Sequence, residues 1–407
     1  MPMNDDIGWL GGWEGYRVSW IDRREGPYAE IWIYLSPLTD GPVICDGCGA
    51  EVRDIHEIAA REVRDLPILD ARTWLWVPRR RVSCPRCGPK LERLSWLGRY
   101  SRVTKRLAES VARLCAVLSI KQVAAFFGLG WDAVKAIDRR HLEERLGPVD
   151  LTDVTVIAMD EFAIQKGHRY ATVIVDPIVK RVLWVGRGRG RKDIRPFFRL
   201  LGKAGRKRLQ AVVMDMNGAY ETEVRHQCPE AEIVFDLFHV VAKYGREVID
   251  RVRVDEANRL KGDTKARKVI KSSRWLLLRN RDAIKKDEDR IRLDELLAAN
   301  HALMTAYVLK DDLKSLWTHR NEADARAAWN SWFSRAIESG IEALIAFARK
   351  LETYLSGIIA HCRWPLHTSL LEGINNKIKV IKRMAYGFRD DQFFFLKIRA
   401  AFPGNPG

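Results

Sequence analysis

The sequence predicts a multidomain α/β protein: a mixed sheet with an all-helical insertion, preceded by a β-rich module and a pair of helices. Three observations predict this order. Two C-x-x-C pairs lie before residue 90, a helix–glycine turn–helix pattern follows them, and β-rich segments alternate with amphipathic ones from residue 150 onward. The divisions that we expect are residues 1–98, 99–148, 149–256, 257–356 and 357–407.

The charge balance favours a polyanionic partner. The 407-residue chain carries 70 Lys and Arg against 53 Asp and Glu, a formal net charge of +17 that is spread along the sequence. Such an excess is typical of proteins that bind nucleic acid, although a basic enzyme kept soluble by its charge is the alternative. No apolar run reaches the length of a membrane span, and the N-terminus lacks a signal-peptide pattern. We therefore expect a cytoplasmic protein that has no membrane partner.

Four of the seven cysteines form two matching pairs, "CDGCGA" and "CPRCGP", each followed by glycine. One C-x-x-C is also compatible with redox chemistry, but two with matching flanks favour a tetrahedral four-sulfur zinc site. The expected ligands are Cys45, Cys48, Cys84 and Cys87. Strand-like segments surround both pairs, so residues 1–98 are expected to form a small β-rich module that structural zinc stabilises.

Residues 99–148 have the pattern of a helix-turn-helix. The segment "IKQVAAFFGLGWDAVKAIDRRHLEERLG" gives a short helix, a turn at Gly128-Leu129-Gly130, and a second helix from about Trp131. The second helix would offer Lys135, Arg139 and Arg140 to a DNA groove. Any pair of helices joined by a glycine turn looks similar, and that alternative stays open.

Further basic residues are candidates for DNA contact. They lie beside the second cysteine pair, in the "GRGRGRK" turn, and on a helix late in the chain. The residues are Arg79, Arg80, Arg81, Arg187, Arg189, Lys377, Lys379, Lys382 and Arg383. A solvated strand edge is an equal alternative for the first three, and a plain solvated loop for the turn.

From residue 150 the order of elements is βββ-α-β-α-β-α. The strands are "VTVIAMD", "YATVIVD", "VKRVLWVGR", "LQAVVMD" and "AEIVFD", and the first three are joined by links too short for anything but hairpins. This is the order of the ribonuclease-H-like fold, in which the first and fourth strands lie side by side and parallel. Residues 257–356 read as helices and would form an insertion into this domain.

Two of these strands end on a carboxylate. Asp160 would end the first strand and Asp215 the fourth, which places them together at the edge where open α/β sheets bind ligands. A divalent cation between them would relieve their repulsion. Glu372, in "SLLEGINNKIKVIKRMAYGF", is the best third ligand, because it lies among bases that suit a phosphate backbone. Each Asp alone could instead be a turn or helix cap.

With these residues in view, the chain resembles the insertion-sequence transposases of the ISL-three family. The resemblance spans nearly the whole chain and is carried by the two cysteine pairs, the helix-turn-helix, "DLFHVVAKYGREVIDRVR" and "LLEGINNKIKVIKRMAYGFRD". It implies that Asp160, Asp215 and Glu372 are the three catalytic acids. Asp236 and His239 match a D-x-x-H element that would support the site, although a helix cap beside a satisfied histidine is an equal interpretation.

The resemblance implies a DNA transposase with two Mg²⁺ or Mn²⁺ ions per active site, held by the three acids, and no small-molecule cofactor. Its partners would be double-stranded DNA, as the terminal inverted repeats and the target, and a second copy of the chain. It would lie in the cytoplasm with the nucleoid. A DNA-binding regulator that has lost catalysis and a structure-specific DNA nuclease are the alternatives.

Overall fold

The computed structural model describes residues 11–38, 41–165, 167, 169–366 and 369–404. The chain divides into two compact units. The first comprises residues 1–147 and 382–396, and the second comprises residues 148–381 and 397–407. Within the described ranges, no helix is both long enough and apolar enough to cross a membrane.

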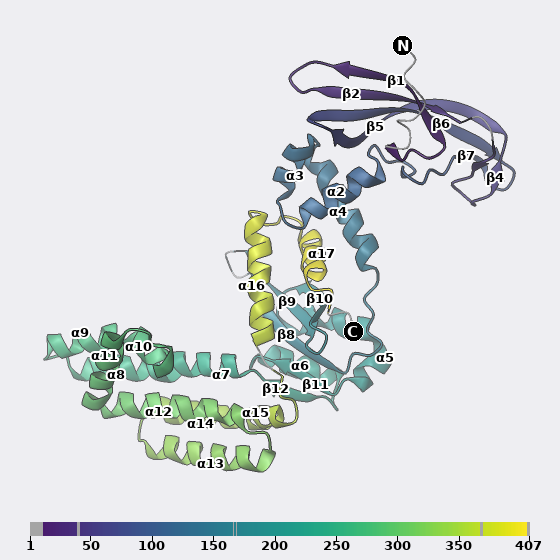
Figure 1. Ribbon diagram of the computed structural model, residues 1–407. Helices are drawn as coiled ribbons and strands as arrows, with labels where there is room; N and C mark the ends of the chain where they lie inside the picture. Colours follow the sequence, from purple (N-terminus) through teal and green to yellow (C-terminus); the bar gives the residue numbers. More distant parts are fainter. Residues whose placement is uncertain (1–10, 39–40, 166, 168, 367–368, 405–407) are drawn as a thin grey trace. The chain divides into compact units, whose positions relative to one another are not determined.

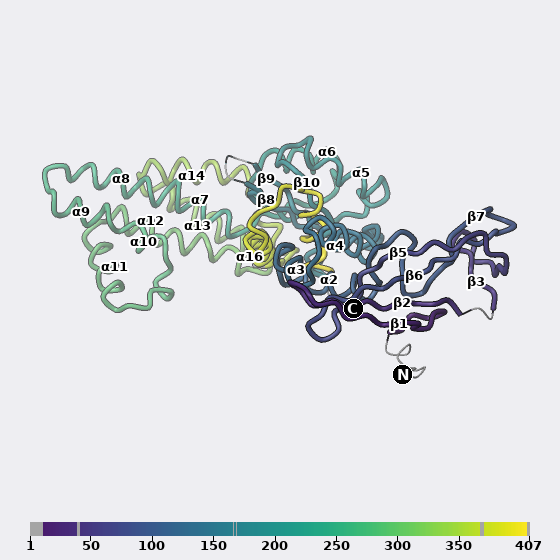
Figure 2. Tube along the Cα trace, turned by 90° about the horizontal axis from the view of Figure 1, so that it is seen from above, coloured from purple at the N-terminus to yellow at the C-terminus, as the bar shows by residue number. Residues whose placement is uncertain are grey.

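The first unit begins with a five-stranded sheet. Its strands are β1 (Tyr16–Arg24), β2 (Glu30–Pro37), β6 (Ala71–Cys84) and β5 (Ile55–Ile68), in that order, with β7 (Gly88–Leu91) paired to β6 (Figure 2). Alternate residues of neighbouring strands, such as Ile33 and Leu75, are buried on one face, as the period-2 pattern predicts. The short strands β3 (Val43–Ile44) and β4 (Glu51–Val52) form a separate hairpin. The predicted β-rich module is therefore confirmed.

Three helices follow in the same unit: α2 (Lys105–Cys115), α3 (Ile120–Phe127) and α4 (Trp131–Leu146). Ser119 and Gln122 form a capping box at the start of α3. Gly128 ends α3 in the left-handed conformation, with φ of 61°, which a residue with a side chain adopts at a cost. Phe127 and Val134 are buried between the helices, so the predicted helix, glycine turn and second helix are present.

The second unit contains a five-stranded mixed sheet. Its strands are β8 (Val156–Gln165), β9 (Arg169–Asp176), β10 (Arg181–Arg187), β11 (Ala211–Met214) and β12 (Glu232–Phe235). They lie in the order β10-β9-β8-β11-β12; β8 and β9 are antiparallel, whereas β11 is parallel to both β8 and β12. The helices α5 (Arg191–Arg208) and α6 (Gly218–Gln227) pack together beside it (Figure 1). The predicted order of elements, with the first and fourth strands adjacent, is confirmed.

One detail of the prediction is wrong. The first strand does not end on Asp160, because β8 continues to Gln165. Its antiparallel partner β9 pairs with it from Ala158 to Gln165 and extends the hairpin, whereas the parallel partner β11 stops at Met214. The edge that carries the carboxylates is therefore set by the end of β11.

Helices fill the chain between β12 and the end. They are α7 (Leu237–Tyr244), η1 (Gly245–Ile249), α8 (Asp250–Arg259), α9 (Thr264–Ser272), α10 (Arg274–Leu278), η2 (Arg281–Ala283), α11 (Asp287–Ala299), α12 (His301–Ser315), η3 (Leu316–Thr318), α13 (Glu322–Glu338), α14 (Glu342–Glu352), α15 (Leu355–Ile359), η4 (Ala360–Cys362), α16 (Ser369–Met384) and α17 (Asp391–Ala401). The sheet and the helices as far as α15 share one hydrophobic core, which includes Phe235, Tyr244 and Trp332. Buried hydrogen bonds reinforce this core, since Tyr244 Oη donates to the Ala306 carbonyl at 2.8 Å and Trp332 Nε1 to that of Leu309 at 2.8 Å.

Candidate active site

Asp160 lies on β8, and Asp215 directly follows the neighbouring parallel strand β11. Val213 of β11 pairs with Ala158 of β8, and each aspartate follows its member of this pair by two residues. Asp160 is 6% exposed, and Asp215, directly after the end of β11, is partly buried. The sheet therefore brings these two predicted acids to one edge, as the element order led us to expect.

The surroundings of both aspartates disfavour their charged forms. Burial raises the pKa of Asp160 to about 6, and burial also raises the pKa of Asp215; nearby His239 opposes both shifts. The backbone N–H of Glu161 donates to Asp160 Oδ1 at 2.7 Å. Buried carboxylates with raised pKa values are typical of sites that bind a cation or perform proton chemistry.

Asp236 and His239 adjoin this pair. Asp236 caps α7 by accepting a hydrogen bond from the N–H of Phe238 at 2.7 Å. His239 lies one turn further on, with Nε2 3.7 Å from Asp236 Oδ2 and 3.9 Å from Asp160 Oδ1. Asp236 thus acts as a helix cap, and His239 places its imidazole next to Asp160.

Glu372 lies near the start of α16, and its side chain is exposed. Among the described residues, the three predicted acids do not form a closed cluster of metal ligands; the four paired cysteines do. Asn375, three residues after Glu372, makes the contact with the aspartate pair: its Nδ2 donates to Asp160 Oδ2 at 2.6 Å. The sequence interpretation missed Asn375, although residues i and i+3 share a face of a helix.

The residues at this edge fit a divalent cation. Three buried oxygens have no hydrogen-bond partner: Asp215 Oδ1, Asn375 Oδ1 and Glu161 Oε2. Buried acceptors without a donor are costly, and a cation satisfies them. Carboxylate and amide oxygens are the ligands that Mg²⁺ and Mn²⁺ prefer.

The four paired cysteines converge in the first unit. Cys45 follows β3, Cys84 ends β6, and the four Sγ atoms lie within 4.8 Å of one another. Gly49 and Gly88 have φ of 76° and 68°, which explains the glycine after each pair. Hydrogen bonding with Cys48, the largest cause, raises the pKa of the Cys87 thiol to about 12, and a cation would reverse this shift because it binds thiolates.

The basic run beside the second cysteine pair is mostly structural. Arg79 and Arg80 are 3% and 9% exposed. Arg80 Nε donates to Glu92 Oε2 at 2.7 Å, and Arg79 Nη2 donates to the Glu92 carbonyl at 2.8 Å. Their burial argues against the phosphate contacts that we expected of them, so they leave the set of candidates. Arg81 is exposed and pairs with Glu57 at 2.9 Å.

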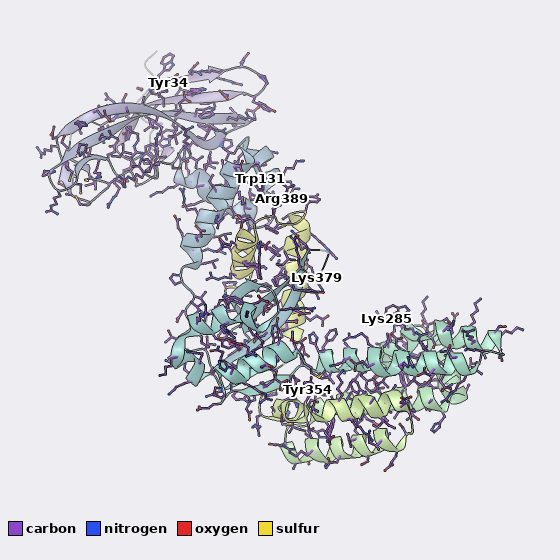
Figure 3. The ribbon with its side chains drawn as sticks, turned by 180° about the vertical axis from the view of Figure 1, so that it is seen from behind. Tyr34, Trp131, Lys285, Tyr354, Lys379 and Arg389 are labelled. Carbon is purple, nitrogen blue, oxygen red and sulfur yellow. The ribbon has the colours of Figure 1, made fainter. Side chains whose placement is uncertain are left out.

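On the second helix of the helix-turn-helix, two predicted DNA contacts have a partner within the same unit. Lys135 Nζ and Arg139 Nη1 lie 3.0 and 3.1 Å from Asp390 Oδ2. Arg140 is exposed, and so is Trp131 at the start of α4 (Figure 3). The carboxylate of Asp390 therefore holds two cations of a surface that was predicted to face DNA.

The other basic candidates differ in their surroundings. Arg189 pairs with Glu161 at 2.8 Å and stacks on Tyr170, with its guanidinium carbon 4.1 Å from the ring centre. Arg189 is nevertheless exposed, as are Arg187, Lys377, Lys379 and Arg383, whereas Lys382 is partly buried. Lys379 extends from α16 (Figure 3) and contacts Asn376 Oδ1 at 3.2 Å.

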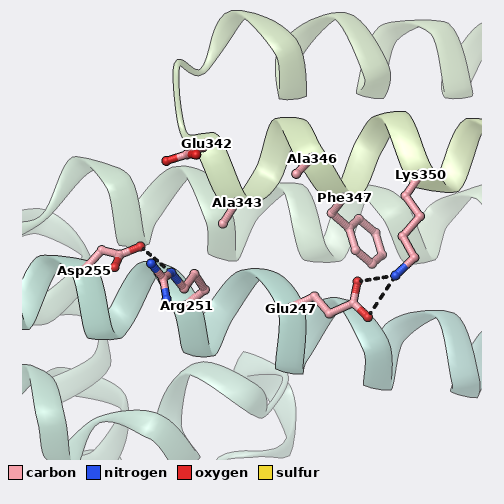
Figure 4. A pocket seen from close by; sticks show the side chains of 8 residues that line it. All are labelled: Glu247, Arg251, Asp255, Glu342, Ala343, Ala346, Phe347 and Lys350. Atoms are coloured by element: carbon pink, nitrogen blue, oxygen red, sulfur yellow. Dashed lines mark hydrogen bonds and ion pairs between the residues drawn. The ribbon is translucent and has the colours of Figure 1, made fainter.

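A groove elsewhere in the second unit is an unsuitable reaction site. It lies between η1–α8 and α14, has a volume of about 410 Å³, and is lined by charged residues of both elements (Figure 4). Lys350 pairs with Glu247 at 3.3 Å and Arg251 with Asp255 at 3.1 Å. These charges neutralise one another across the groove and along α8, so the aspartate edge is the better candidate.

Three family models match the chain. A transposase model matches residues 157–398, a helix-turn-helix domain of transposase family ISL3 matches residues 92–142, and a zinc finger of the transposases IS204/IS1001/IS1096/IS1165 matches residues 41–87. The first match alone covers more than half of the chain. The chain belongs to the ISL3 family of transposases.

Relatives of this transposase agree with the assignment. It is 56% identical to the transposase for insertion sequence element IS1001 of Bordetella parapertussis, over 97% of each chain. It is 26% identical to the transposase for insertion sequence element IS1557 of Mycobacterium tuberculosis, over 86% of this chain and 83% of that protein.

The family assignment confirms the main expectations. The chain is a DDE-type transposase, a catalytic enzyme of an IS1001-like insertion sequence, with a helix-turn-helix for DNA and a four-cysteine zinc site.

Proposed function

We propose that this transposase binds the terminal inverted repeats of its insertion sequence, cleaves DNA at their ends and joins those ends to a target. The observation that carries the proposal is the placement of Asp160 and Asp215: each follows by two residues its member of the Ala158–Val213 pair on adjacent parallel strands, and both have raised pKa values. Burial disfavours the ionised form of these two carboxylates when no cation is bound, so the pair is suited to hold cations beside a phosphodiester.

In the proposed site Asp160, Asp215 and Glu372 hold two Mg²⁺ or Mn²⁺ ions. The ions would activate the attacking hydroxyl or water and stabilise the leaving 3′ oxygen. Asp160 is oriented by the Glu161 N–H, and the Nε2 atom of His239 lies beside it. The exposed carboxylate of Glu372 is free to approach the aspartate edge when DNA binds, as catalytic contacts often tighten only in the complex.

DNA binding in the proposal is divided between parts of the chain. The helix-turn-helix recognises the terminal repeats, with Arg140 exposed on α4. The exposed basic residues Arg187, Lys377, Lys379 and Arg383 contact the phosphate backbone. Two element ends must be brought together, which favours a homodimer. The five divisions of the sequence and a cytoplasmic location at the nucleoid belong to the same proposal.

The experiment that tests the proposal is end cleavage. Purified protein is incubated with Mg²⁺ or Mn²⁺ and a labelled duplex that carries the flanking repeat of its own element. We expect nicking at the repeat boundary that is lost in Asp215→Ala while duplex binding persists. Glu342→Gln, which changes an exposed carboxyl in the helical insertion, is the matched control and should cleave normally. Binding without cleavage by the unmodified protein would contradict the proposed reaction.

A further inference from the structure

The contact between α16 and the aspartate edge is made by Asn375. Its Nδ2 lies 2.6 Å from Asp160 Oδ2, across 215 positions of sequence, and its side chain is partly buried. The neighbouring Asn376 is exposed and contacts Lys379 on its own helix instead. The contact with Asp160 therefore depends on the position of residue 375 on the helix, because Asn376 has the same side chain and contacts Lys379 instead.

This contact fixes the second oxygen of the Asp160 carboxylate. Oδ1 accepts from the N–H of Glu161 at 2.7 Å, and Oδ2 accepts from Asn375. Each oxygen keeps a further lone pair, since a carboxylate offers about four acceptor positions. A carboxylate that is held at both oxygens presents those lone pairs in a fixed direction, which is the role that outer hydrogen bonds have around metal ligands.

The amide oxygen of Asn375 indicates more than a structural hydrogen bond between α16 and the sheet. Its Oδ1 is buried without a hydrogen-bond partner, and so is Asp215 Oδ1. Asn375 is hydrogen-bonded to Asp160, and Asp215, which follows β11 beside β8, is near enough to raise the pKa of Asp160. Two buried acceptors cannot satisfy each other, whereas a cation satisfies both.

We propose that Asn375 is part of the divalent-cation site: its Nδ2 orients Asp160, and its Oδ1 is a further oxygen ligand. This inference rests on the proposed function, because the cation is the one that Asp160 and Asp215 would hold. It adds a neutral ligand from the same helix face as Glu372, so that α16 contributes to the site through two residues one turn apart.

The test measures Mn²⁺ binding by calorimetry on the full, zinc-loaded chain without DNA, so that activity is not the readout. Asn375→Ala should weaken Mn²⁺ binding about 10-fold or more, the usual loss when a group around a metal ligand is removed. Asn376→Ala is the matched control and should bind as the unmodified protein does. Equal affinity in Asn375→Ala and the unmodified protein would overturn the inference.

Asn375→Asp separates the two parts of the role. This variant keeps an oxygen at the ligand position and loses the donor to Asp160. Binding that is stronger than in Asn375→Ala supports ligation through Oδ1. Binding as weak as in Asn375→Ala overturns the ligand assignment. Circular dichroism and zinc content, compared with those of the unmodified protein, exclude misfolding as the cause of any loss.

The failure of this inference can be told apart from that of the proposed function. If the unmodified protein binds no Mn²⁺, or binds it equally well as Asp215→Ala, the proposed metal site itself is wrong. If Mn²⁺ binding depends on Asp215 but not on Asn375, only the present inference is wrong.

Discussion

The Nε2 atom of His239 lies 3.9 Å from Oδ1 of Asp160, within the reach of an ion pair when the imidazole is protonated. The same nitrogen is 3.7 Å from Asp236, so it stands between two buried carboxylates. Its presence lowers the pKa of Asp160, but burial has the larger effect and the net direction is upward. His239 thus compensates only part of the cost of charging the site.

Asp160→Asn should stabilise the cation-free protein above pH 6. Burial raises the pKa of Asp160 from 3.8 to about 6, so the folded chain holds this proton more tightly than the unfolded chain. The resulting stabilisation is full below about pH 3.8 and is lost as the pH rises through about 6. The variant does not titrate there and should gain on the order of 3 kcal/mol relative to the unmodified protein.

Thermal unfolding between pH 4.5 and 8 in the presence of a chelator that spares the zinc site measures this difference. The gap in Tm between Asp160→Asn and the unmodified protein should widen toward pH 8. Mn²⁺ should close the gap by stabilising the unmodified protein alone. A gap that is constant over the whole pH range would contradict the role assigned to the buried charge.

Arg80→Ala and Arg81→Ala should behave oppositely although the residues are adjacent. Arg80 pairs with Glu92, which is 1% exposed, whereas both partners of the Arg81–Glu57 pair are about half exposed. Removing one partner of a buried pair costs roughly 3–5 kcal/mol, and an exposed pair contributes about 0–1 kcal/mol. We expect a large fall in Tm for Arg80→Ala and little change for Arg81→Ala. Comparable Tm values would contradict the structural role of Arg80.

The burial of Arg80 could not be predicted from the sequence. The strands and the helix-turn-helix could be predicted because hydrophobic periodicity and glycine turns are local features of the sequence. The cysteine site could be predicted because its ligands come in two pairs of fixed spacing. Arg80 looked exposed because its partner, Glu92, meets it only when β7 pairs with β6. Asn375 was missed because its contact with Asp160 depends on how α16 packs on the sheet. Contacts between distant segments carry no local pattern.

Cys48→Ser should release zinc and destabilise the β-rich module. The four Sγ atoms lie within 4.8 Å of one another, and the cluster of buried residues around them is small, with Val43, Val52 and Val82 beside the cysteines. Metal binding therefore supplies a large part of the local folding free energy. Metal analysis should find one zinc ion per chain in the unmodified protein and a loss in the variant. Cys362→Ser, outside this cluster, is the control and should retain the zinc.

Asp390→Asn should tighten DNA binding. The carboxylate of Asp390 lies 3.0 Å from Lys135 Nζ and 3.1 Å from Arg139 Nη1, and its Oδ1 caps α17 by accepting a hydrogen bond from the N–H of Phe393 at 3.0 Å. Asparagine retains the acceptor for the cap but removes the charge, which releases Lys135, whereas Arg139 keeps its ion pair with Glu143 at 3.0 Å. Each phosphate contact adds about 0.9 to the slope of log affinity against log salt, so the release of Lys135 should steepen the slope by about one.

Titration of a labelled repeat duplex at several salt concentrations measures both quantities. The same substitution in a chain that carries Lys135→Ala and Arg139→Ala is the matched control, because it removes the charge of Asp390 without freeing either cation. Asp390→Asn should raise the DNA affinity of the otherwise unmodified chain. It should leave the affinity of the chain with Lys135→Ala and Arg139→Ala unchanged. An equal rise in both would show that the effect comes from net charge alone. A fall in the first would mean that Asp390 instead holds α4 in its binding orientation.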